Sequence, residues 1–229
     1  MIVDTVLNNA KAYLKQEIVD CSIAVEEGKI FKIGKETQMP KANETINLHD
    51  LLVLPGVIDS HVHLRDEDKA YEETFETGTA AAAAGGVTTV LDMPNNSPIT
   101  MSREVLHNRM RIAERRVLVN VGFYSEFPAK LDDMSGIIVE GVVGFKLFMA
   151  EQVGGLNIDD DEALTEAFQK AGELKVPVAV HAEDKTLLKK AVKELKLANR
   201  HDVKAFLKAH DERVELEAIN RLLSLSANV

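Results

Sequence analysis

The chain has 229 residues, of which 45% are hydrophobic and 28% charged, and these values exclude an extensively disordered protein. Its formal net charge of −10 excludes a general binder of nucleic acid, because such proteins concentrate Lys and Arg against the phosphates. No apolar stretch is long enough to span a membrane, no secretory signal pattern is visible, and the lone cysteine cannot form a disulfide within the chain, so we expect a cytoplasmic protein.

Short β-like runs fill the first fifty residues. They span Ile2 to Leu7, Cys21 to Glu26 and Lys29 to Gly34. A turn is expected at Glu27-Gly28. From Leu51 onward, apolar strands alternate with helical segments, which is typical of a parallel sheet joined by crossover helices. The sequence therefore predicts a small β-rich domain, part of a β-sandwich, over residues 1–50 and a second domain over residues 51–229.

Five strands are predicted in this second domain: Leu52 to Ile58, Val87 to Met93, Val117 to Tyr124, Val142 to Phe148 and Val176 to His181. Helices are predicted around residues 79–84, 163–171, 187–195 and 214–225. A complete (β/α)8 barrel needs about 250 residues, so only part of one fits. We therefore expect an α/β fold with an incomplete barrel and open sheet edges, either a fragment or a chain whose barrel a second polypeptide completes.

A pair of histidines, His61 and His63, comes directly after the apolar run 51–58, so the strand is expected to end just before them. Residues two apart in an extended segment point the same way, so both imidazoles can reach one cation. Two solvated or hydrogen-bonded histidines are the alternative. His181, at the end of the last predicted strand, is open to the same two interpretations.

Lys146 lies within the apolar run 142–149, where a charged ammonium is costly unless its end is exposed or paired. Taken alone, a lysine that extends to solvent from the strand end is the commoner case. The other interpretation is a neutral amine that has captured carbon dioxide, because the resulting carbamate is an anionic ligand for two metal ions. Barrel enzymes build their sites at the C-terminal ends of strands, and the joint placement of these candidates there favours a metal centre.

Two further residues suit a substrate carboxylate. Arg65 lies on the same side as the histidine pair if the chain stays extended, and could bind a carboxylate bidentately, although a surface ion pair is the alternative. Asn95 follows the second strand and could donate an amide hydrogen bond, although Asn is also an ordinary turn residue. The acidic run 159–162 is expected to cap a helix, and His107 and His210 are expected to face solvent.

Taken together, four segments resemble the dihydroorotase, or cyclic amidase, branch of the amidohydrolase superfamily. The matching segments are Pro55-Gly56-Val57-Ile58-Asp59-Ser60-His61-Val62-His63-Leu64-Arg65, the unit from Gly78 to Asn95, Gly144-Phe145-Lys146-Leu147-Phe148, and Val180-His181-Ala182-Glu183. They resemble, in order, the first metal motif, the second strand–helix unit, the carboxylated-lysine strand and the next histidine strand. The similarity extends over essentially the whole chain.

The resemblance implies two divalent metal ions, zinc in the first instance. The implied ligands are His61, His63, Lys146 as a bridging carbamate, and His181. It implies that Arg65 and Asn95 hold the substrate carboxylate. The implied reaction is the interconversion of N-carbamoyl-L-aspartate and dihydroorotate in pyrimidine biosynthesis. The catalytic aspartate of the family and a further metal-binding histidine would lie beyond Val229, so no catalytic residue is assigned.

Several alternatives stay open beside this resemblance. Asp66-Glu67-Asp68 stands where the family usually has Glu-Pro-Gly, which puts the shape of that loop in question. Hydantoinases and allantoinases share the metal ligands, although Arg65 and the run Met93-Pro94-Asn95 favour dihydroorotase. A non-catalytic scaffold that assembles with a partner enzyme is the alternative outside the enzymes. The expected partner is a small-molecule substrate, and a homo-oligomer or a second polypeptide remains possible.

Overall fold

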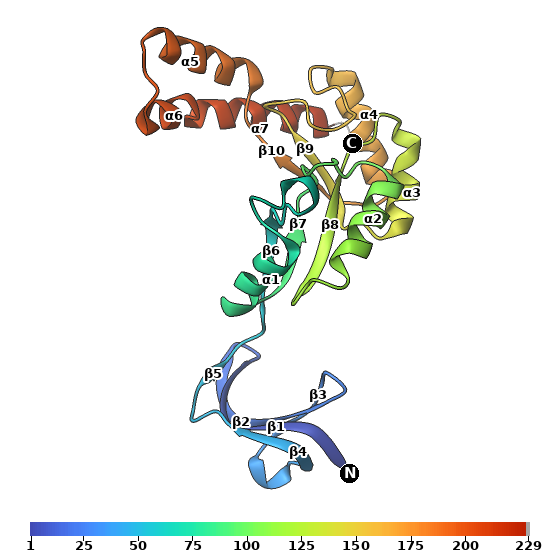
Figure 1. Ribbon diagram of the computed structural model, residues 1–229, viewed down its shortest axis with the longest axis vertical. Helices are drawn as coiled ribbons and strands as arrows, with labels where there is room; N and C mark the ends of the chain where they lie inside the picture. The colour runs from blue at the N-terminus through green and yellow to red at the C-terminus, as the bar shows by residue number, and fades with distance from the viewer. Residues whose placement is uncertain (228–229) are drawn as a thin grey trace. The chain divides into compact units, whose positions relative to one another are not determined.

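The computed structural model describes residues 1–227 and divides the chain into two compact units, Met1–Gly56 and a second that begins at Val57 (Figure 1). Each unit is described by itself. Within the described residues, no helix is both long enough and apolar enough to cross a membrane.

The first unit is one sheet of five strands, β1 (Ile2–Leu14), β2 (Glu17–Glu26), β3 (Lys29–Gly34), β4 (Lys41–Asn47) and β5 (Leu52–Val53). Strands β3, β2, β1 and β4 follow one another across the sheet, and β5 also pairs with β1. The first two pairings are antiparallel, whereas β1 runs parallel to β4 and β5. Small apolar clusters form its core, and Cys21 packs, half-buried, against one of them.

The predicted turn at Glu27-Gly28 is confirmed, since both residues have left-handed φ angles, +50° and +70°, between β2 and β3. The prediction for the first strand was too short, because β1 continues to Leu14. Strand β4 was missed, because its sequence from Lys41 to Asn47 is mostly polar and gives no β-like run.

The second unit contains a parallel sheet of five strands, β6 (Val57–Val62), β7 (Val87–Asp92), β8 (Asn120–Glu126), β9 (Gly144–Phe148) and β10 (Val178–His181). They lie in the order β10-β9-β8-β7-β6, so each strand pairs with its neighbour in sequence. The main helices are α1 (Phe75–Ala84), α2 (Arg103–Ala113), α3 (Met134–Glu140), α4 (Asp161–Glu173), α5 (Lys185–Leu197), α6 (Val203–Ala209) and α7 (Glu212–Ser226). This confirms the predicted α/β class and the strand order of an incomplete (β/α)8 barrel.

One predicted strand, Leu52 to Ile58, was wrong as a single element. Leu52–Val53 forms β5 and pairs with β1, whereas β6 begins at Val57. Pro55 lies between them and has no backbone N–H to donate to a sheet, which accounts for the interruption.

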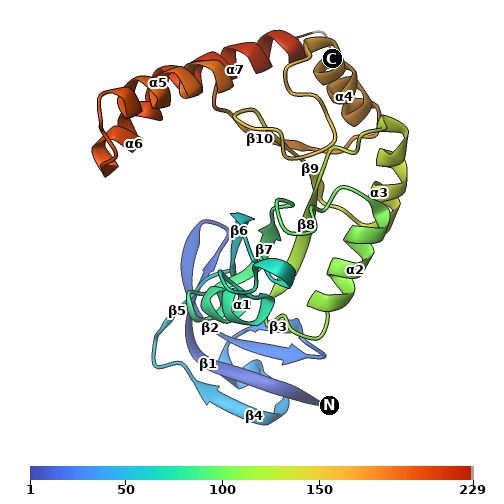
Figure 2. The same ribbon diagram turned by 45° about the horizontal axis from the view of Figure 1, so that its top comes forward.

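Side-chain caps fix where the helices begin. Thr74 and Thr77 form a capping box at α1, and Ser102 accepts the Val105 N–H at α2. Asp160 accepts backbone N–H groups at α4, which confirms the capping prediction for the acidic run. Helices α2 and α3 lie together on one side of β8 (Figure 2).

Burial falls from the middle of the sheet to its edges. All five residues of β9 are buried, and Phe127 stacks on Phe145 beneath it with ring centroids 5.1 Å apart. At the edge, Val57 and Ile58 of β6 are 56% and 65% exposed. The expected open, apolar sheet edge is therefore present at β6, within the described part of the chain.

Candidate metal and substrate site

The predicted metal ligands lie on parallel strands or directly after one. Lys146 is in the middle of β9, and His181 is the last residue of β10. The expectation that the first strand ends before the histidine pair was wrong, because β6 runs through His61 to Val62 and His63 follows directly. Since parallel strands end on the same side of a sheet, this topology brings residues from distant segments together.

One pocket of about 520 Å³ brings three of these residues together, His61, Lys146 and His181. The pocket is also lined by four acidic side chains and one further histidine: Glu183, Asp211, Glu212, Glu215 and His210. His63 does not line the pocket, but its ring centroid lies 5.4 Å from that of His61. The histidine pair therefore borders the pocket from the β6 side.

Lys146 is the most unusual side chain in this pocket. It is 1% exposed, so the interpretation of a lysine that reaches solvent was wrong. Burial lowers the pKa of Lys146, although the nearby Glu126 opposes this shift. Its Nζ atom lies 4.8 Å from the ring centroid of Phe148, and it forms no hydrogen bond or ion pair within the described residues. A buried, unpaired amine with a lowered pKa fits the neutral form that reacts with carbon dioxide.

Glu126 is a neighbour of Lys146 that sequence reasoning missed. It lies opposite Lys146 in the β8–β9 register, and burial raises its pKa to about 8 despite the opposing charge of Lys146. Its Oε1 atom has no hydrogen-bond partner among the described residues. The only signal in the sequence is a charged residue at the end of a strand, which many surface carboxylates share.

His181 is held by a carboxylate that also binds a second histidine. Glu183 accepts a hydrogen bond from His181 Nε2 at 2.7 Å and another from His210 Nδ1. Burial alone would raise the pKa of Glu183, but the bonds from His210 and His181 lower it. The bond at Nε2 leaves the Nδ1 atom of His181 available as a metal donor. The prediction that His210 faces solvent was wrong, because His210 lines the pocket, binds Glu183 and has a side chain that is only 26% exposed.

The two predicted substrate residues meet beside His63. Asn95 Oδ1 lies 2.8 Å from His63 Nδ1, and Arg65 Nη1 donates to the Asn95 carbonyl oxygen at 3.3 Å. Arg65 is not extended, since its φ is +52°, so a turn and not a strand brings it to Asn95. The surface ion pair considered for Arg65 is also present, because its Nε lies 2.9 Å from Glu72 Oε2.

Both histidines of the pair favour the neutral imidazole, the form that binds metals. Burial lowers the pKa of His61, and the positive charges of Lys146 and His181 add to this. Burial also lowers the pKa of His63, with Arg65 contributing in the same direction.

The donor set depends on the lysine. Among residues 1–227, no three His, Cys, Asp or Glu side chains lie close enough to hold a metal ion by themselves. The histidines present therefore fit a metal centre only together with Lys146, whose amine becomes an oxygen ligand once it is carboxylated.

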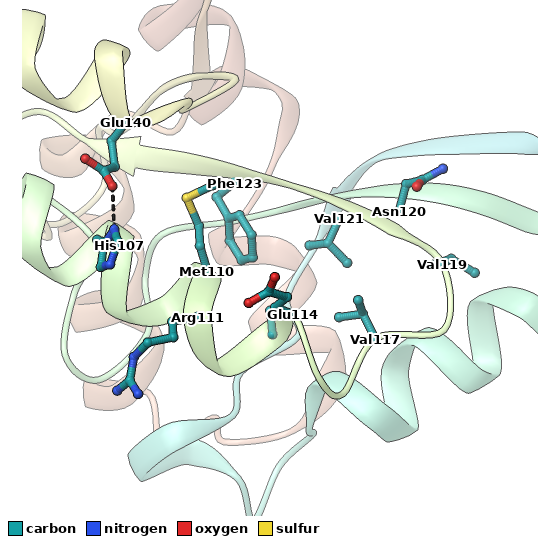
Figure 3. A pocket seen from close by; sticks show the side chains of 11 residues that line it. His107, Met110, Arg111, Glu114, Val117, Val119, Asn120, Val121, Phe123 and Glu140 are labelled. Atoms are coloured by element: carbon teal, nitrogen blue, oxygen red, sulfur yellow. Dashed lines mark hydrogen bonds and ion pairs between the residues drawn. The ribbon is translucent and has the colours of Figure 1, made fainter.

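A larger pocket, of about 700 Å³, lies between helix α2 and strand β8 (Figure 3). Met110, Val121 and Phe123 give it an apolar wall, and His107 pairs with Glu140 at its rim. None of the six predicted site residues lines it, so it is separate from the candidate site.

Comparisons with known proteins agree on one family. The family model described as dihydro-orotase-like matches residues 50–225. A dihydroorotase of Methanosarcina acetivorans is 34% identical over 185 residues, which cover 80% of this chain and 39% of that protein. An allantoinase of Solibacter usitatus is 32% identical over 212 residues, covering 91% of this chain and 46% of that protein.

A solved structure gives the same result for the fold. The L-hydantoinase (dihydropyrimidinase) from Arthrobacter aurescens matches with a TM-score of 0.90 at 30% identity, covering 99% of this chain and 51% of that one. The chain thus spans between 39% and 51% of these three relatives. The predicted fold class is confirmed.

Proposed function

The chain belongs to the dihydro-orotase-like family, and we propose that its protein is a metal-dependent hydrolase of cyclic amide C–N bonds. The observation that carries this proposal is the meeting of His61, Lys146 and His181 in one pocket from three strands. A non-catalytic scaffold has no chemical need for a buried, unpaired lysine between histidines, because such a lysine costs stability unless it does something else.

The residues that would hold two divalent ions, zinc in the first instance, are His61, His63, His181 and the carbamate of Lys146. When bound, such ions lower the pKa of a water molecule and polarise the amide carbonyl. The chain itself contributes neutral imidazoles on the β6 side, and Glu183 orients His181 on the other. Because these donors lie on strands or directly after one, we expect the sheet to hold them together before the ions bind.

As the substrate we propose dihydroorotate, formed reversibly from N-carbamoyl-L-aspartate in cytosolic pyrimidine biosynthesis. Its ring carries a carboxylate, and Arg65 is a cation placed next to the metal-ligand pair, 22% exposed in its side chain and therefore partly desolvated. A guanidinium recognises a carboxylate through paired N–H donors, and Asn95 adds an amide at the same place.

A neutral cyclic amide, such as a hydantoin or allantoin, is the second candidate substrate. The contact that favours it is the ion pair between Arg65 and Glu72, since a guanidinium already paired with a carboxylate attracts an anionic substrate less strongly. The similarity to an allantoinase and to an L-hydantoinase, at 32% and 30% identity, supports this candidate as well.

The test combines turnover with metal analysis on the full-length protein. We expect about two equivalents of metal, turnover of dihydroorotate, and a loss of about 100-fold in kcat/KM for Arg65→Ala because a partly buried charged contact is removed. Metal content should stay unchanged in that variant. Lys146→Arg keeps a long basic side chain but cannot form the carbamate, so it should lose metal and activity together.

Three results would contradict the assignment. Loss of metal from Arg65→Ala would remove Arg65 from substrate binding. Turnover of hydantoin or allantoin without turnover of dihydroorotate would establish the second candidate. A stable wild-type protein without bound metal, unchanged by Lys146→Arg, would establish the scaffold.

A further inference from the structure

Arg109 of helix α2 is a fully buried arginine outside the candidate site. Its side chain is 0% exposed, and it binds two carboxylates: Nη2 and Nε lie 2.7 and 3.0 Å from Asp92 Oδ2, and Nη1 lies 2.7 Å from Glu67 Oε2. The guanidinium also stacks 4.6 Å above the ring centroid of Phe75. Buried ion pairs seldom add stability over apolar packing of the same size, so this arrangement calls for another reason.

The carboxylate that Arg109 holds connects two loops of the candidate site. Asp92 ends β7, and its second oxygen accepts the backbone N–H of Leu64 at 2.8 Å. Leu64 stands between His63 and Arg65 in the chain, and Asp92 is three residues before Asn95. The position of one carboxylate therefore determines where both segments leave the sheet.

The loop itself needs such support, because its backbone is strained. Arg65, Asp66 and Glu67 have φ angles of +52°, +59° and +51°, in the left-handed region that non-glycine residues rarely adopt. Three of them in a row persist only where surrounding contacts fix them. The Asp66 carboxylate supplies some of these contacts, since it accepts from the Glu67 and Phe75 N–H groups at 2.7 and 2.9 Å.

Two arginines complete the support from outside the loop. Arg116 donates to Asp66 at 2.8 Å, and Arg109 binds Glu67. The sequence at this place, Asp66-Glu67-Asp68, is the departure from the family's usual Glu-Pro-Gly. The acidic residues thus provide the partners that these arginines need, and the loop is held by charge instead of by proline and glycine.

We infer that Arg109 is a positioning residue, which fixes the guanidinium of Arg65 through Asp92 and Glu67 and thereby sets the affinity for a carboxylate-bearing substrate. The inference rests on the proposed function, in which Arg65 binds that carboxylate. Arg109 touches neither substrate nor metal, so its effect should appear in KM and leave the chemical step nearly intact.

The test uses Glu67→Gln in the full-length protein, because Arg109→Lys removes buried charge-assisted contacts to two carboxylates and is expected to destabilise the fold. The matched control is Asp161→Asn. Asp161 begins helix α4 of the same unit, and its Oδ1 atom lies 2.6 Å from Arg221 Nη2, so this variant likewise removes the charged partner of an arginine. We expect Glu67→Gln to raise KM for dihydroorotate about tenfold, the effect of one weakened charge-assisted contact, with kcat changed less than about twofold. The control should change neither.

Hydrogen exchange separates this inference from the proposed function. Exchange of the Leu64 and Glu67 amides should rise at least about tenfold in Glu67→Gln and stay constant in Asp161→Asn, because only the first loosens the loop. An unchanged KM, or equal losses in KM and kcat that track melting temperature, would overturn the positioning role. If the wild type does not convert dihydroorotate, the proposed function fails, and unchanged exchange in Glu67→Gln would then overturn the inference by itself.

Discussion

Single side chains determine the charge of the candidate site around Arg65. The Arg65 guanidinium uses Nε for Glu72 and Nη1 for the Asn95 carbonyl, so under the proposed function a substrate carboxylate would share it with a carboxylate already present. The side chain of Glu72 is 37% exposed, and an exposed ion pair contributes little stability, on the order of 0–1 kcal/mol. We therefore infer that Glu72 matters more for the charge of Arg65 that remains available to a ligand than for the free energy of unfolding.

Replacing Glu72 by Gln should strengthen binding of an anionic substrate. Removal of the competing negative charge is expected to lower KM for dihydroorotate about threefold to tenfold, the usual effect of one nearby charge. Michaelis constants measured at two salt concentrations check this, since screening reduces the gain. Glu76→Gln, an exposed carboxylate on α1, is the control. A KM that is equal in wild type and Glu72→Gln would show that the ion pair does not compete with substrate.

At this scale the sequence predicts some residues well and others not at all. Lys146 stands out because a charge inside an apolar run is rare, and the structure places it in the pocket as a buried, unpaired amine. Glu183 could be found only through its spacing of two from His181. His210 and Arg109 carry no local signal, because their partners lie 27 and 17 residues away or more.

Among the elements, the loop after β6 is held together by ionised side chains. Burial alone would raise the pKa of Asp66, but the N–H groups of Phe75 and Glu67, followed by Arg116, lower it below the ordinary 3.8. A carboxyl with a lowered pKa stabilises the fold above its unfolded pKa, and this stabilisation is lost as the pH falls through the folded value. The loop should therefore loosen in acid.

Asp66→Asn tests this dependence. At pH 7 the variant should lose about 1.5–3 kcal/mol in the free energy of unfolding, because it weakens hydrogen bonds to a charged group. Near pH 3 wild type and variant should differ less, since Asp66 is then largely protonated in the unfolded chain. Denaturant unfolding at both pH values measures the difference. The exposed Asp50→Asn, in the first unit, serves as control, and a gap that grows in acid would contradict the sign.

Four of the seven main helices and the buried strand β9 followed from the sequence because their patterns are local, whereas α2, α3 and α6 were not predicted. The apolar stripes of α4, α5 and α7 and the run of β9 gave these elements within a few residues of their ends. Strand β4 did not, since only its pairing with β1 makes Lys41–Asn47 a strand. The break at Pro55 went unnoticed because the apolar run passes through it without change.

The parallel sheet of the second unit is open, and its edge at β6 is strongly exposed. Strand β6 pairs only with β7 among the described residues, and its Val57 and Ile58 are more than half exposed. An exposed apolar edge strand is a site where chains associate. We therefore expect the 229-residue polypeptide to self-associate through β6 at high concentration.

Ile58→Lys should reduce this association. A charge on an edge strand opposes edge-to-edge pairing, so the weight-average mass at high concentration is expected to fall about twofold, from dimer toward monomer. Sedimentation or light scattering over a concentration series measures it. Tyr71→Lys places the same charge on an 82% exposed residue outside the sheet and should have no effect. Equal masses for wild type and Ile58→Lys would exclude the β6 edge as the contact.

The order of strands in the second unit was predictable because each strand pairs with the next one in sequence. Alternation of strands and helices is enough for that inference. The backbone of the loop after β6 was not predictable. Its left-handed φ angles at residues 65–67 accompany contacts with Arg109 of α2 and with Arg116, which follows that helix.

The half-buried thiol of Cys21 is a natural site for labelling the first unit. It is the sole cysteine in the chain and belongs to the unit that contains none of the predicted metal or substrate residues. A maleimide fluorophore can be coupled to Cys21 without removing other cysteines. We expect its emission to report melting of the N-terminal sheet. Calorimetry of the same labelled sample records every transition, so the comparison separates the two units.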